Sequence, residues 1–104
     1  DIADFKTIRS PPRAMLHVAE TICIVFGKKP LFVNFVKIVE SPMFLINLKS
    51  FDETQLSEYN LIKLKDYIKD ENFNPEYILK MSKFASVLCK WIRLIYQIFT
   101  IKST

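Results

Sequence analysis

The sequence predicts an all-α fold, a small bundle of five or six helices. Gly occurs once in 104 residues, which disfavours a β-rich fold built on tight turns. Half of the residues are hydrophobic and nine are Phe, so one core can form in a domain of this size. Apolar residues recur at helical spacing between Pro and Gly boundaries, and these boundaries set the order of the elements.

The first ten residues have the pattern of the last turns of a helix. Ile2, Phe5 and Ile8 fall on one side of it. Pro11 and Pro12 then interrupt the pattern, because neither can donate a backbone hydrogen bond. Since the chain starts in the middle of this pattern and without Met, we expect it to be a fragment of a longer protein.

A second helix is predicted to run through Phe26. Ser10 is a candidate N-cap with proline in the first turn, and Gly27 provides the left-handed residue that ends the helix. The apolar face contains Met15, Val18, Ala19, Ile22, Cys23 and Phe26. The exit is basic, with Lys28, Lys29 and Pro30.

The middle of the chain predicts three short elements. Residues 31–40 are apolar, and the spacing favours a helix over a buried strand, with Phe32, Phe35, Val36 and Val39 on one side. Ser41 and Pro42 open a short helix that ends near Lys49. After a polar loop over residues 51–57, a helix over 57–69 is carried by Leu61, Ile62, Leu64 and Ile68.

The clearest start signal is Asn74, Pro75 and Glu76, a cap followed by proline and an acid in the first turn. No Gly or Pro follows, so one helix of about 25 residues is predicted past Phe99, twice the usual length. Such a helix would leave the domain as a stalk. If the two helical ends pair, the chain caps an antiparallel coiled coil: residues 1–10 end its first helix, 11–91 form the head, and 92–104 begin the second helix.

The sequence contains few residues that could support catalysis or bind a metal ion. The only histidine, His17, lies on or beside an apolar helix face, where a core-edge role is commonest. Cys23 and Cys89 are far apart and lack the spacing of zinc ligands, and we expect buried free thiols rather than a disulfide. With a single Gly there is no phosphate-binding loop. We expect no enzyme activity, no metal and no cofactor.

The charge balance indicates an acidic partner. The formal net charge is +4 and the pI is near 9.1, which suits nucleic acid, an anionic membrane or an acidic protein surface. Nucleic acid is disfavoured, since the basic residues are scattered among eleven acids and no known binding motif occurs. A membrane span is disfavoured because the best stretch, 84–101, is broken by Lys90 and Arg93.

The predicted last helix carries a basic stripe. Its members recur at intervals of three, seven and three: Lys80, Lys83, Lys90 and Arg93. Glu76 lies one turn before Lys80, which favours an i,i+4 ion pair. A solvated helix face explains such a stripe equally well, so the stripe alone is a weak signal.

Three stretches together resemble one family, the dynein heavy chains. PPRAMLHVAETICIVFGKKP (11–30) resembles the first helix of their microtubule-binding head, and FNPEYILKMSKFASVLCKW (73–91) resembles the last. PMFLINLKSFD (42–52) resembles the short segment between them. The matches are collinear. The Gly-Lys-Lys-Pro exit and the Cys-Lys-Trp-Ile ending are more similar to axonemal (ciliary) dyneins than to the cytoplasmic form.

The resemblance implies a head that binds α/β-tubulin in microtubules. In this family the ATPase ring lies elsewhere in a very long heavy chain, and sliding between two stalk helices switches the head between weak and strong binding. The location implied is the cytoskeleton, most specifically the cilium. Carried over from the family, the tubulin-contacting residues would be Glu76, Lys80 and Lys83, followed by Arg13, His17, Lys28 and Lys29.

Two departures from the family pattern predict weaker or altered tubulin binding. Leu16 and Ser41 stand where members carry basic residues. The alternative function is a helical protein-interaction domain whose partner is not tubulin. The stalk hypothesis requires Ile2 and Phe5 to lie beside Leu94, Ile95 and Ile98.

Overall fold

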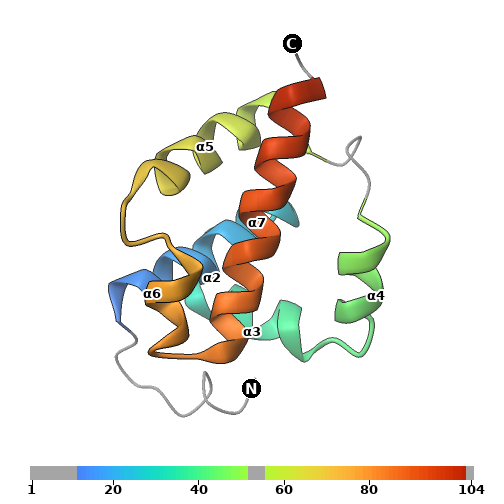
Figure 1. Cartoon of the computed structure of the whole chain (residues 1–104). Coiled ribbons are helices and arrows are strands. Elements are labelled where there is room, and N and C mark those ends of the chain that lie inside the picture. The colour runs from blue at the N-terminus through green and yellow to red at the C-terminus, as the bar shows by residue number, and fades with distance from the viewer. Residues whose placement is uncertain (1–11, 52–55, 103–104) are drawn as a thin grey trace.

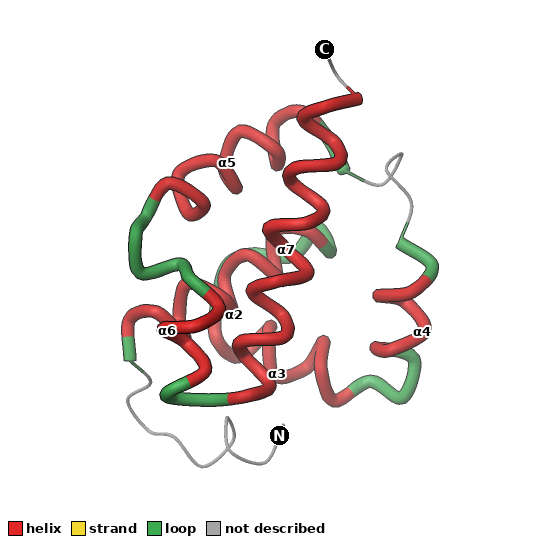
Figure 2. The backbone as a smooth tube through the Cα atoms, viewed as in Figure 1, coloured by secondary structure: helices red, strands yellow, loops and turns green. Residues whose placement is uncertain are grey.

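The structure is a computed structural model that describes residues 12–51 and 56–102. In these ranges it contains six α-helices and no strand, which confirms the predicted all-α fold (Figures 1 and 2). The helices are α2 (Arg13–Val25), α3 (Phe32–Glu40), α4 (Phe44–Lys49), α5 (Glu58–Lys69), α6 (Pro75–Leu79) and α7 (Lys83–Lys102). The segment predicted to end the first stalk helix, residues 1–10, lies outside the described residues, and so do Ile2 and Phe5.

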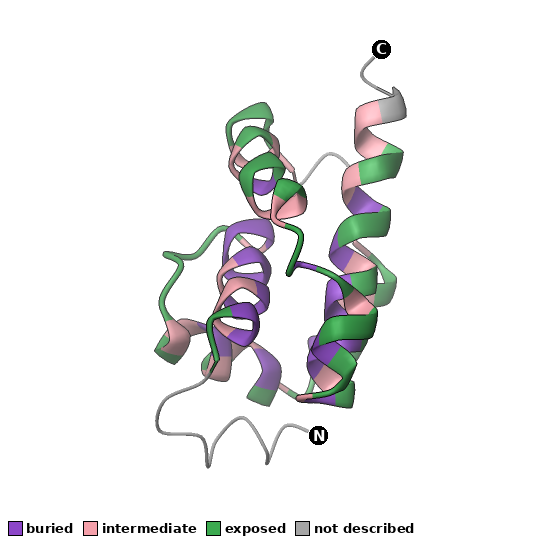
Figure 3. Ribbon diagram, turned by 60° about the vertical axis from the view of Figure 1, so that its left-hand side comes forward, coloured by how far each residue is buried: buried purple, intermediate pink, exposed green. Residues whose placement is uncertain are grey.

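Helix α2 forms the centre of the core. It packs against α3, α5 and α7, so it is buried on most sides, as the purple turns of Figure 3 show. The predicted apolar face is confirmed, although Phe26 is only half-buried. The buried side chains are Ala14, Met15, Val18, Ala19, Thr21, Ile22, Cys23, Ile24 and Val25.

The two ends of α2 differ from each other in how well the sequence predicted them. At the start, Pro12 is the N-cap with ψ 152°, so the expectation that it lies in the first turn is wrong; its extended backbone precedes the helix. Ser10 is outside the described residues. At the end, Gly27 has φ 73°, and the Lys28 amide donates to the Cys23 carbonyl at 2.8 Å. This is a Schellman motif and confirms the predicted stop.

Helix α3 confirms the helical interpretation of residues 31–40. Helix α4 begins later than predicted, at Phe44, because a turn precedes it: the Ser41 hydroxyl accepts from the Met43 amide at 3.2 Å. Phe44 is the buried residue of α4. Phe44 is therefore the deepest anchor of this helix, with Leu48 packed beside it, while Leu45 and Ile46 are exposed.

Helix α5 begins as predicted at Ser57, whose hydroxyl accepts from the Asn60 amide at 3.1 Å. Leu64 is its buried residue. The prediction that Ile62 contributes to the apolar side is wrong, because its side chain is 66% exposed. Leu61 and Ile68 are half-buried, so α5 lies on the bundle along a narrow edge.

The predicted continuous last helix is wrong. Helix α6 ends at Leu79 and α7 begins at Lys83. Ser82 causes the break: its hydroxyl accepts from the Ala85 amide at 3.2 Å, an N-cap that starts a new helix instead of extending the old one. The Ser86 hydroxyl donates to the Pro75 carbonyl at 2.8 Å and holds α6 back against α7.

Aromatic side chains join α7 to the middle of the chain. Trp91 stacks on Phe26 with ring centroids 6.1 Å apart and meets Phe51 edge-on at 5.5 Å. Phe51 also contacts Phe99. This packing fixes the side of α7 that faces α2. Within residues 12–51 and 56–102, no helix has both the length and the hydropathy for a bilayer crossing.

Candidate functional site

Four of the seven predicted contact residues lie at one end of the bundle. Arg13 begins α2, Glu76 lies in α6, and Lys80 and Lys83 flank the α6–α7 turn. All four side chains are exposed. Figures 1 and 3 place the start of α2 and the α6–α7 turn at the lower end, opposite the end at which α7 finishes. We call this the α6–α7 end.

The α6–α7 turn presents its two lysines to solvent. Asn74 caps α6 by accepting from the Glu76 amide at 2.8 Å, which leaves the Glu76 carboxylate beside the positive helix N-terminus. Lys80 ends α6 and Lys83 is the first residue of α7, whose first turn contains no acid. Within the described part of the chain, neither lysine has an ion-pair partner, and the predicted Glu76–Lys80 pair is not formed.

The basic stripe predicted along one long helix is divided. Lys80 precedes α7 and does not share its face, because the chain turns at Met81 and Ser82. Arg93 is engaged within the fold, since its guanidinium donates to the Phe73 carbonyl at 3.2 Å. The stripe therefore reduces to Lys83 and Lys90 on α7.

Lys28 and Lys29 form a separate basic corner. They follow the end of α2, and 13 helical residues at ~1.5 Å each place them about 20 Å from Arg13. The Lys29 carbonyl accepts from the Asn34 side chain at 3.1 Å, which holds this connection against α3. Both lysine side chains are exposed.

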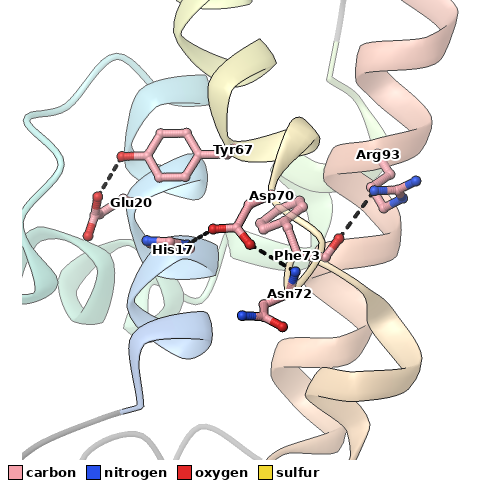
Figure 4. A network of polar contacts seen from close by, with 7 residues as sticks. All are labelled: His17, Glu20, Tyr67, Asp70, Asn72, Phe73 and Arg93. Carbon is pink, nitrogen blue, oxygen red and sulfur yellow. Dashed lines mark hydrogen bonds and ion pairs between the residues drawn. The ribbon is translucent and has the colours of Figure 1, made fainter.

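His17 points into the protein, unlike the other six residues. Its ring is 17% exposed, its Nδ1 lies 3.6 Å from Asp70 Oδ2, and its edge meets the Tyr67 ring at 5.4 Å (Figure 4). Asp70 follows α5, so this contact joins α2 to the α5–α6 connection. The sequence pattern indicated the core-edge position of His17 but not its partner 53 residues later.

A second polar contact joins α2 to α5. The Tyr67 hydroxyl donates to Glu20 at 2.5 Å. Burial, together with this hydrogen bond to a carboxylate, raises the pKa of Tyr67 above its usual range, so the phenol remains a proton donor at any physiological pH. The Glu20 carboxylate is therefore engaged in a hydrogen bond within the bundle.

The two cysteines are free and buried, as predicted. Burial raises the pKa of each thiol to about 11, which leaves little of the reactive thiolate near neutral pH. The Cys23 thiol also points at the Leu31 carbonyl, 3.5 Å away. In the described ranges no group of three His, Cys, Asp or Glu side chains could hold a metal ion.

Helix α7 has an apolar stripe on the side away from the core. Val87, Leu94 and Ile98 are 55%, 54% and 39% exposed. Their intervals of seven and four residues match a coiled-coil seam. Of the three stalk contacts predicted from the sequence, Leu94 and Ile98 lie in this stripe, whereas Ile95 is 7% exposed and packs within the bundle. Val87 was not predicted, although the heptad spacing is visible in the sequence.

Known proteins match this chain over nearly its whole length. A family model described as the microtubule-binding stalk of dynein motor matches residues 1–103. Human dynein axonemal heavy chain 6 is 30% identical over 93 residues, which cover 89% of this chain and 2% of the human protein. The ciliary dynein beta chain of Tripneustes gratilla is 31% identical over 108 residues, or 97% of this chain and 2% of the relative. Mouse dynein axonemal heavy chain 1 is 28% identical over 112 aligned positions, which cover 93% of this chain and 3% of the mouse protein.

These relatives are far longer than this chain, which spans only a few per cent of their length. The family match, however, covers every helix described above. The all-α bundle with an apolar stripe on its last helix accords with it. The chain therefore belongs to the family of microtubule-binding stalk domains of dynein motors.

Proposed function

We propose that this chain binds α/β-tubulin in microtubules through the α6–α7 end. The observation that carries the proposal is the pair Lys80 and Lys83, exposed and without an acidic partner among the described residues. Tubulin presents an acidic surface, so these cations supply steering and a reversible, salt-sensitive attraction. Arg13 adds a third cation, and Glu76 is placed to limit the attraction by repelling acids.

The remaining predicted residues take secondary places in this proposal. Lys28 and Lys29 form a second basic corner at the other end of α2. They would add to the positive electrostatic potential that attracts tubulin without taking part in the contact at the α6–α7 end. His17 is the weakest candidate for direct contact, since its ring faces Tyr67 and Asp70.

The outer stripe of α7 supports coupling to a stalk. Val87, Leu94 and Ile98 present a continuous apolar seam, and a second helix lying along it would complete a coiled coil. Because this seam leads toward the end opposite Lys80 and Lys83, a stalk helix sliding along α7 would act on the bundle from the side away from tubulin. The segment 1–10 and its continuation are the proposed stalk partner.

The chain is proposed to be one part of a larger heavy chain. Its relatives named above are axonemal and ciliary dyneins, which favours the cytoskeleton of a cilium as its location. The motor ATPase would lie elsewhere in that heavy chain. This domain then contributes attachment and no catalysis, and it has no role for a nucleic acid, a membrane or a cofactor.

A second candidate function is a helical interaction domain with a non-tubulin partner. It is favoured by α4, whose outer side exposes Leu45 and Ile46 next to Met43. An apolar partner surface would cover these side chains better than an acidic one. The two candidates differ in their response to salt, because burial of apolar side chains is not screened.

Microtubule co-sedimentation across a salt series tests the proposal. The whole 104-residue chain would be fused to a rigid coiled coil that fixes the stalk in either of two registers. Raising the ionic strength from ~0.01 M to ~0.1 M shortens the Debye length from about 30 Å to about 10 Å, so pelleting should fall steeply. Salt-insensitive pelleting would favour the apolar surface of α4. A folded chain that does not pellet in either register would refute tubulin binding.

A further inference from the structure

We propose that His17 and Asp70 form a clasp whose closure depends on the position of α2 relative to α7. This inference rests on the proposed function, because stalk sliding is what would move the two helices. It assigns His17 a role inside the bundle, as a positioning residue for the tubulin-binding end. The clasp is the His17–Asp70 contact together with the α5–α6 connection, residues 70–74, that carries it (Figure 4).

The α5–α6 connection is attached to α7 at several points. The Phe73 side chain is 1% exposed and sits in the core, while its carbonyl accepts from Arg93 of α7 at 3.2 Å. Just beyond it, the Pro75 carbonyl accepts from the Ser86 hydroxyl of α7 at 2.8 Å. The buried Phe73 side chain and the Arg93 hydrogen bond hold this connection to α7, and the Ser86–Pro75 hydrogen bond holds the helix that follows it to α7.

Its contact with α2 through His17 is weaker than the Tyr67–Glu20 hydrogen bond that holds the end of α5 to α2. His17 Nδ1 lies 3.6 Å from Asp70 Oδ2, beyond the 2.7–3.2 Å usual for a hydrogen bond to oxygen. His17 Nδ1 is also buried without a hydrogen-bond partner in the structure. An unmade hydrogen bond at a buried polar atom is unfavourable, so the pair has a driving force to close. A shift of α2 by less than about 1 Å would bring the two atoms within hydrogen-bonding distance.

A hydrogen bond holds Asp70 in its turn, and no other group among the described residues hydrogen-bonds to His17 Nδ1. Asp70 Oδ1 accepts from the Asn72 amide at 2.8 Å, which fixes the carboxylate in the turn. From α5, Tyr67 meets the imidazole with its ring, and its hydroxyl is already given to Glu20. The displacement of α2 relative to residues 70–74 therefore decides whether the clasp is closed.

The first test measures the His17–Asp70 contact in the absence of tubulin. His17 is the only histidine of the chain, so ¹⁵N-labelled protein gives one set of imidazole signals. The 104-residue chain would be held in each of two registers by a coiled coil free of histidine. We expect the Nδ1 shift to differ between the registers, and to differ no longer after Asp70→Asn. Identical shifts in both registers would overturn the clasp. A failure to bind microtubules would instead count against the proposed function alone.

The second test measures how loss of the His17–Asp70 contact changes the affinity for microtubules. His17→Phe keeps an aromatic ring against Tyr67 and removes Nδ1, whereas Asp70→Asn keeps an oxygen for the Asn72 amide. Each variant should reduce the ratio of microtubule affinities between the two registers by up to about fivefold, the range for a partly exposed ion pair. The double variant should do no more than either single one. Glu71→Gln, an exposed neighbouring acid, is the control and should leave the ratio unchanged. Equal loss of affinity in both registers would mean a structural role only and would overturn the proposal.

Discussion

Replacing Lys80 and Lys83 together with glutamate is expected to weaken microtubule binding by about 30-fold. Each substitution removes a favourable charge pair, worth ~0.2–1 kcal/mol, and adds a repulsion of similar size. Two such changes total about 0.8–4 kcal/mol, and about 2 kcal/mol, near the middle of that range, corresponds to about 30-fold because each 1.4 kcal/mol is tenfold in affinity. Co-sedimentation of wild type and variant at low salt, in the register that binds more strongly, measures the difference.

The two glutamates are not expected to unfold the domain, so weaker pelleting can be attributed to the loss of the two cations. Lys83 is the first residue of α7 and no acid lies in that first turn, so a glutamate there would complement the helix dipole. Lys65→Glu with Lys69→Glu on α5 is the matched control. Both double variants lower the formal net charge from +4 by four, to zero. If both weaken binding equally, net charge and not the α6–α7 end governs attraction, and the proposed site is wrong.

Phe73→Ala is expected to cost about 3–5 kcal/mol of folding free energy, as large aromatic truncations in cores do. Phe73 is 1% exposed although it lies in a connection, and it fastens the α5–α6 segment under α7. Domains of this kind have only ~5–15 kcal/mol in total, so the variant should be much more sensitive to urea. Urea unfolding followed by circular dichroism measures the change.

Tyr77→Ala provides the comparison for Phe73→Ala. Tyr77 is also an aromatic residue, four positions later in α6, but its side chain is 41% exposed. Removing it should cost under about 1 kcal/mol, since exposed substitutions rarely cost more. Equal urea midpoints for the two variants would show that the connection does not depend on its buried anchor.

Local signals predicted most of the helices. Gly27 ends α2 because only the left-handed backbone at that residue completes the Schellman motif, and Ser57 and Asn74 cap helices by bonds to amides two or three residues later. Such signals act over a few residues and can be recognised in a sequence. The break before α7 was missed because Ser82 also fits a helix interior. The hydrogen bond from Ser86 to Pro75 depends on folding α6 back, which no local pattern shows.

The candidate site was only partly predictable for the same reason. Exposure of Lys80 and Lys83 follows from their positions opposite the apolar residues of the last two helices. The partners of His17 and Arg93 lie 53 and 20 residues away in the chain, so they depend on how α5 and α6 pack. The helical spacing therefore predicted more cations available for binding than the structure offers, because the Arg93 guanidinium donates to the Phe73 carbonyl.

In the proposed binding mode the α6–α7 end faces tubulin while α7 leads away from it. Electron cryomicroscopy of microtubules decorated with the register-fixed chain tests it most directly. We predict density for the start of α2 and the α6–α7 turn against the lattice, with the C-terminal end of α7 pointing away from the microtubule. An orientation in which the outer sides of α4 or α5 meet tubulin, with Lys80 and Lys83 in solvent, would contradict it.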